Sequence, residues 1–83
     1  MHGANAVSTR SEEDIMKILI AAIPIVSARD KDKIIAWLRE QCLLSESNLY
    51  KITPRADCPK EWPLGWKLSL ETAIEKLKNS GGP

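Results

Sequence analysis

Basic and aromatic side chains alternate in one short stretch of the sequence. Arg55, Lys60 and Lys67 lie close along the chain to Trp62 and Trp66. Lysines and arginines neutralise phosphates, and an indole ring offers a base a flat surface on which to stack. The pattern is typical of a nucleic-acid contact. The opposing interpretation is that these tryptophans anchor the stretch to the core, as Trp often does in small domains. The alternating pattern around Trp66 favours the core, whereas Trp62 is open to either role.

The elements that must position this stretch are predicted from hydrophobic periodicity and turn residues. Ser11 and Ser27 each precede a carboxylate by three residues, which is the pattern of a helix N-cap. Pro24 is expected to end the first helix. In chain order the expected elements are helices at 11–23 and 27–42, a short helix or turn at 45–48, strands at 50–53 and 66–70, and a helix at 69–80.

This order predicts an α+β domain with a single core, of the form α-α-(short α)-β-β-α. The two strands would be an antiparallel pair joined by residues 54–65, a long connection that contains three prolines. Helices followed by a hairpin with a long tip are compatible with a winged helix, in which one helix reads DNA and the hairpin touches its backbone. The predicted nucleic-acid contacts are then Ser45, Ser47, Asn48, Lys51, Arg55, Lys60, Trp62 and Lys67. Against this, the third helix would be very short and lacks basic residues.

The first predicted helix offers a second candidate surface. Its apolar sector is wider than one contact layer requires, because Met16 and Ile20 flank the main stripe. These two side chains are expected to contact a partner protein or a second copy of the chain. The alternative is that the helix is central in the core and covered by the other elements.

Composition limits the possible classes of protein. The chain has 83 residues, 12 Lys and Arg against 11 Asp and Glu, and a net charge of +1, which excludes a strongly basic, histone-like binder. We expect one domain over residues 11–80, with disordered ends at 1–10 and 81–83. Without a signal peptide or a long apolar run, the protein is expected to be soluble and intracellular.

The expected oxidation state of the cysteines follows from the expected compartment. Cys42 and Cys58 are expected to be free thiols, with a disulfide between them as the alternative. Cys42 ends a predicted amphipathic helix and is expected to be buried. Cys58 lies in the proline-containing connection, where it could be exposed.

The sequence offers few residues for catalysis. The single histidine is His2, and there is no CxxC pair, no glycine-rich phosphate loop and no nucleophile motif. We therefore expect no catalytic residue, no cofactor and no metal site. Two classes of non-catalytic binding module remain. One is a nucleic-acid binder, favoured by the order of elements and the basic, aromatic stretch. The other is a protein-interaction or dimerisation domain that uses the first helix or Trp62, favoured by the near-zero net charge. The sequence-based prediction is the nucleic-acid binder, with the protein-interaction domain as the alternative.

Overall fold

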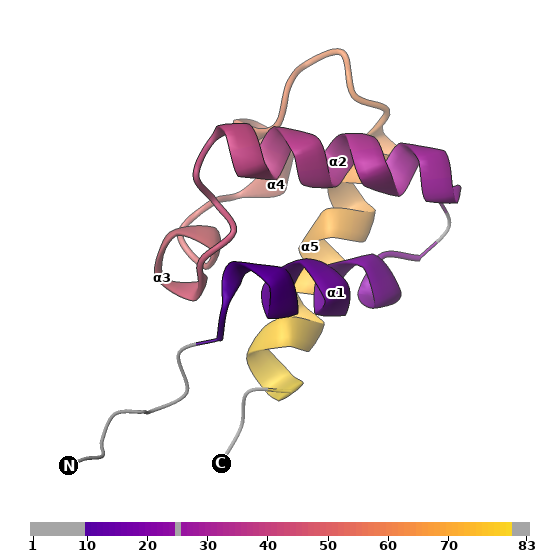
Figure 1. Ribbon diagram of the computed structural model, residues 1–83. Helices are drawn as coiled ribbons and strands as arrows, with labels where there is room; N and C mark the ends of the chain where they lie inside the picture. The colour runs from indigo at the N-terminus through magenta and orange to yellow at the C-terminus, as the bar shows by residue number, and fades with distance from the viewer. Residues whose placement is uncertain (1–9, 25, 81–83) are drawn as a thin grey trace, which may run out of the picture.

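The computed structural model describes residues 10–24 and 26–80, and these residues form helices and connections but no strand (Figure 1). The prediction of an α+β domain with a β-hairpin is therefore wrong, and the winged-helix arrangement is wrong with it. The helices in this part of the chain are α1 (Glu12–Ala22), α2 (Ala28–Glu40), α3 (Glu46–Leu49), α4 (Pro54–Asp57) and α5 (Leu64–Ser80).

The helices α1 and α2 begin where the capping patterns predicted them. The Ser11 hydroxyl oxygen accepts a hydrogen bond from the backbone amide of Asp14 at 3.1 Å, and Ser27 accepts one from Asp30 at 3.1 Å. Each contact satisfies an amide that has no partner inside its helix. At the other end of α1, the Lys31 ammonium of α2 donates to the carbonyl of Ile20 at 3.0 Å. A cation at a helix C-terminus also complements the helix dipole.

The chain leaves α2 through a left-handed residue that is not glycine. Cys42 has a φ of 57°, the one positive φ at a non-glycine residue in the described chain. The amide of Leu43 donates to the carbonyl of Leu38 at 2.8 Å, and the amide of Cys42 donates to that of Arg39 at 3.1 Å. This pair of bonds is the Schellman motif, in which glycine is the usual left-handed residue. Here a cysteine holds that conformation.

The strand expected at 66–70 is part of α5. Its alternation of apolar and polar residues spans five positions, which is too short to separate a strand from one and a half turns of helix. In the helix, Leu70, Ala73 and Leu77 face the core and are fully buried, whereas Leu68 lies on the outer side and is 36% exposed. Ser69 is the first residue of the helix that the sequence predicts at 69–80. Instead it lies inside α5, and its hydroxyl donates to the carbonyl of Pro24 at 2.8 Å.

The connection expected at 54–65 contains a turn of helix that the sequence analysis missed. Pro54 occupies the first position of α4, where its missing amide hydrogen costs nothing. The Asp57 carboxylate accepts a hydrogen bond from the backbone amide of Thr53 at 2.6 Å and so closes the turn. The strand expected at 50–53 is likewise absent, because Tyr50 ends α3 with a right-handed helical φ and ψ.

The core forms where α5 packs against α1 and α4 (Figure 1). The figure also shows α5 crossing behind both α1 and α2. The largest fully buried side chains are Ile15, Leu19, Ile23, Ile34, Leu38, Leu49, Leu70 and Leu77. No helix in the described chain is both long and apolar enough to cross a membrane. The tail expected at 1–10 lies outside the described residues except for Arg10, as do His2 and the end expected at 81–83.

Candidate functional site

Trp62 lies between two other tryptophans. Its ring centroid is 5.1 Å from that of Trp37 on α2 and 5.5 Å from that of Trp66 on α5, with interplanar angles of 68° and 64°. These are edge-to-face contacts, the favoured geometry for aromatic pairs. All three rings are partly buried and pack against the core. Trp62 therefore packs the connection between α4 and α5 against α2 and against α5 itself.

The basic side chains of the same stretch lie in different environments. The Arg55 guanidinium is 3.1 Å from the Glu71 carboxylate in an exposed ion pair. Lys67 is half-buried, whereas Lys51 and Lys60 are exposed. A phosphate would have to compete with Glu71 for Arg55, which weakens the cationic character of this stretch. Whether these residues bind nucleic acid stays a prediction.

The polar residues around α3 serve mainly to build the helix. The Ser45 hydroxyl accepts a hydrogen bond from the amide of Asn48 at 3.4 Å, and the Asn48 side-chain amide donates to the carbonyl of Cys42 at 3.1 Å. Ser47 is exposed. A helix of one turn with its polar groups engaged in this way has little left to present to a base edge.

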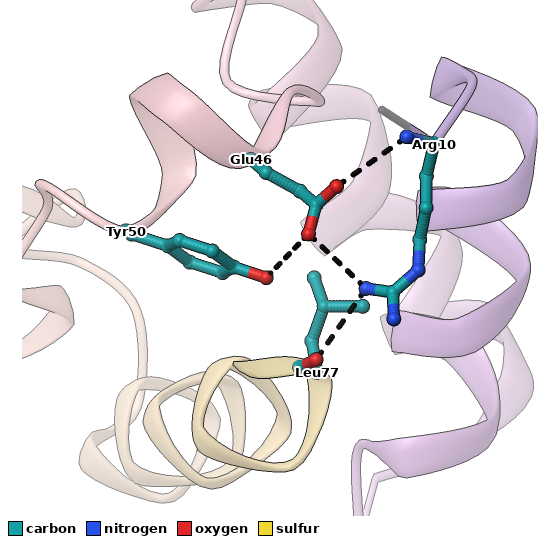
Figure 2. Close-up of polar contacts among 4 residues, drawn as sticks. All are labelled: Arg10, Glu46, Tyr50 and Leu77. Atoms are coloured by element: carbon teal, nitrogen blue, oxygen red, sulfur yellow. Dashed lines mark hydrogen bonds and ion pairs between the residues drawn. The ribbon is translucent and has the colours of Figure 1, made fainter. Parts of the chain in front are cut away.

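A polar network joins α3 and α5 to Arg10, which lies two residues before α1 (Figure 2). One Arg10 guanidinium nitrogen lies 3.2 Å from a Glu46 carboxylate oxygen and 3.4 Å from the carbonyl of Leu77. The Tyr50 hydroxyl donates to the same carboxylate at 2.8 Å. Burial and the contact with Glu46 raise the pKa of Tyr50 above its ordinary value of 10.0. Sequence reasoning missed the network, because its partners are far apart along the chain.

A hollow of about 140 Å³ lies beside this network. Tyr50 and Ile74 are among the residues that line it, and Glu71 and Glu75 contribute carboxylates. Both carboxylates already have a cation from this chain, since Glu71 pairs with Arg55 and Glu75 lies 3.9 Å from the Lys78 ammonium. This hollow therefore has little unbalanced charge with which to select a ligand.

A second hollow, of about 180 Å³, lies between α5 and the chain that follows α1. Its lining is uncharged and consists of Pro24, Gly65, Leu68, Ser69 and Thr72. One turn before Leu68 on the same helix, Leu64 is 61% exposed. We call Leu64 together with this hollow the α5 patch.

Gly65 leaves the α5 patch open. A Cβ atom added at Gly65 would meet no atom within 4 Å, so the space over this residue is empty of the chain's own atoms. The hydrogen bond from Ser69 to the Pro24 carbonyl fixes the opposite wall. The patch is thus a preformed hollow beside an exposed leucine, and the sequence analysis did not predict it.

The predicted partner residues on α1 are less exposed than Leu64. Met16 and Ile20 are both half-buried and pack against the core. The sulfur of Met16 lies 3.1 Å from a guanidinium nitrogen of Arg39. A partner contact through Met16 and Ile20 stays a prediction.

Both cysteines are free, as predicted, but their environments are the reverse of those expected. Cys42 is exposed and lies at the left-handed turn after α2. Cys58 is 4% exposed, and burial raises its pKa from 9.0 to about 11. Among the described residues, no group of three or more His, Cys, Asp or Glu side chains could hold a metal ion.

We expect alkylation to distinguish the two thiols. Thiolates react and thiols do not, so near neutral pH iodoacetamide should modify Cys42 in the folded protein and Cys58 only after unfolding. Peptide mass spectrometry after timed quenching measures both rates. Equal rates in the folded protein would contradict the burial of Cys58.

The same burial predicts a pH dependence. The folded pKa of Cys58 lies above the unfolded value, so the native state holds its proton more tightly. This stabilisation is present below pH 9.0 and is lost as the pH rises through about 11. The fall in unfolding free energy over this range should be smaller in Cys58→Ala.

Comparison with protein-family models, curated proteins and solved structures found no match, so a proposal for the function rests on these surfaces.

Proposed function

We propose that the chain is a non-catalytic protein-interaction domain that docks an apolar side chain of another polypeptide on the α5 patch. The observation that carries this proposal is Leu64, which is 61% exposed beside an uncharged, preformed hollow. Cores of protein interfaces are depleted of charged residues, as this patch is. Nothing in the lining would oppose an apolar group.

The size of the hollow supports an apolar side chain as the occupant. At about 180 Å³ it has room for one apolar side chain, which can enter because the hollow is open to the surface. Burying one leucine-sized side chain removes enough apolar surface to contribute about 1.5–3 kcal/mol. Because the walls are already held by α5 and the Ser69 hydrogen bond, docking requires little reordering of this surface.

The contacts favour this class over a nucleic-acid binder. Arg55 is already paired with Glu71, and Trp62 already contacts two rings of its own chain. The net charge of +1 gives little long-range attraction to phosphates.

Photo-crosslinking from the patch tests the proposal. A benzophenone side chain is placed at Thr72, on the rim of the hollow, and the chain is expressed in its own host. We expect a discrete protein adduct that disappears when Gly65→Leu fills the hollow. The matched control carries the same group at Glu13, which is exposed on α1.

The outcomes separate the two classes. An adduct that survives Gly65→Leu, or that forms equally from Glu13, would overturn docking at the patch. An adduct removed by nuclease would support nucleic-acid binding instead. Circular dichroism should show an unchanged fold in Gly65→Leu, because the space over Gly65 is open.

A further inference from the structure

The α5 patch carries a protruding group and a hollow on the same side of one helix. Leu64 protrudes, and Leu68, one turn later, lines the hollow. A two-fold interface between identical chains requires a surface that is complementary to itself. Leu64, which we call the knob, and the hollow, which we call the hole, lie side by side on one helix and meet that requirement.

We propose that the polypeptide docked on the α5 patch is a second copy of this chain, related by a two-fold axis. Leu64 of each copy lies in the hollow of the other. This inference rests on the proposed function, because it names the occupant of the same surface.

The dimensions suit this occupant. A leucine side chain, with four carbons, is small enough to enter the hollow from its open side. The hollow offers about 180 Å³, and the space over Gly65 is open. Among the large apolar side chains of the described residues, Leu64 and Leu68 are the exposed ones, so a second copy presents its apolar surface at this same helix.

The charges of the patch also permit self-association. A two-fold axis brings each residue of a patch close to its own counterpart, so a charged patch would repel itself. The patch residues Leu64, Leu68, Gly65, Ser69, Thr72 and Pro24 are all uncharged. The Ser69 hydroxyl already donates to Pro24, so a dry contact would not leave that donor unpaired.

The strength expected is modest. The patch consists of Leu64 and the five residues that line the hollow, far fewer than the roughly 20–30 residues a side of a standard stable interface. We therefore expect a dimer with a dissociation constant on the order of 100 µM, which forms reversibly.

Analytical ultracentrifugation of the full chain tests this, over concentrations on both sides of about 100 µM. We expect a monomer–dimer equilibrium. Leu64→Ser removes the knob and Gly65→Leu fills the hole, so each should weaken association about tenfold or more. The control Ala36→Ser changes an exposed residue of α2 and should leave the equilibrium unchanged.

Mixing the two variants gives the sharpest result. Leu64→Ser keeps its hole and Gly65→Leu keeps its knob, so a mixed pair regains one of the two contacts that neither variant can make with itself. The mixture should associate more strongly than either variant alone. A parent chain that stays monomeric, variants that dimerise like the parent, or a mixture no stronger than its components would each overturn the inference.

Failure of this inference is distinguishable from failure of the proposed function. A monomer whose Thr72 probe still crosslinks to a different protein, in a manner blocked by Gly65→Leu, excludes the second copy and leaves the docking function standing. A monomer with no such adduct removes both.

Discussion

Replacing Leu70 with Ala is expected to lower the free energy of unfolding by about 2–5 kcal/mol, the range for deleting a buried leucine side chain. Leu70 is fully buried on α5, whereas Leu68 is 36% exposed on the opposite side. Leu68→Ala should therefore cost about 1 kcal/mol or less, part of it offset by the high helix propensity of Ala. Urea denaturation followed by circular dichroism measures both values.

This pair of variants also tests the change of fold class. In a strand over 66–70, Leu68 and Leu70 would point to the same face and both substitutions would be costly. In a helix Leu68 and Leu70 lie on different faces, and only the Leu70 substitution is costly. Comparable losses from the two variants would contradict the helical assignment of this segment.

Replacing Trp62 with Ala is expected to lower the free energy of unfolding by about 2–4 kcal/mol, somewhat below the cost of deleting a fully buried tryptophan. The variant loses two edge-to-face contacts, with Trp37 and Trp66, each worth about 0.5–1.5 kcal/mol beyond the area buried. It also frees the connection between α4 and α5. Urea denaturation gives the loss, and the near-ultraviolet circular dichroism of the remaining indoles should weaken.

Trp62→Phe is the matched control for this prediction, because it keeps an aromatic edge at the same place and should recover part of the stability. An Ala variant that is as stable as the parent would show that the ring does not anchor the connection. Trp62 would then return to consideration as a surface for stacking a base.

Local patterns in the sequence predicted those parts of the fold that local contacts determine. Ser11 and Ser27 cap the first two helices through hydrogen bonds to residues three positions away, so both starts were correct. The turn of helix at α4 was missed, although its signs are also local. Pro54 at a first helical position and Asp57 bonded back to Thr53 could have indicated it.

The prediction for the start of α5 was wrong for a different reason. The alternation from 66 to 70 fits a strand and a helix equally well over so few residues. Extending the window to Ala73 and Leu77 would have favoured one helical face throughout. The burial of Leu70 and the exposure of Leu68 decide the matter, and burial is a property of the packed molecule.

The α5 patch could not be predicted from the sequence, because it depends on contacts between distant residues. The hollow exists only where Pro24, after α1, meets the first three turns of α5. The exposure of Leu64 likewise depends on what the fold leaves uncovered. Met16 and Ile20 were chosen from the width of an apolar stripe, which cannot show that the fold packs both against the core.

The hydrogen bond from Arg10 to the carbonyl of Leu77 joins residues that are 67 positions apart. The two ends of the segment between them therefore lie within reach of one arginine side chain, held by a contact rather than by a covalent bond. A short peptide linker that joined the two ends of this segment would need little rearrangement of the folded state, because those ends already lie near each other. It would act chiefly on the unfolded chain, by removing the configurations in which those ends are far apart. A cyclised segment of this kind should resist thermal unfolding better than the linear chain.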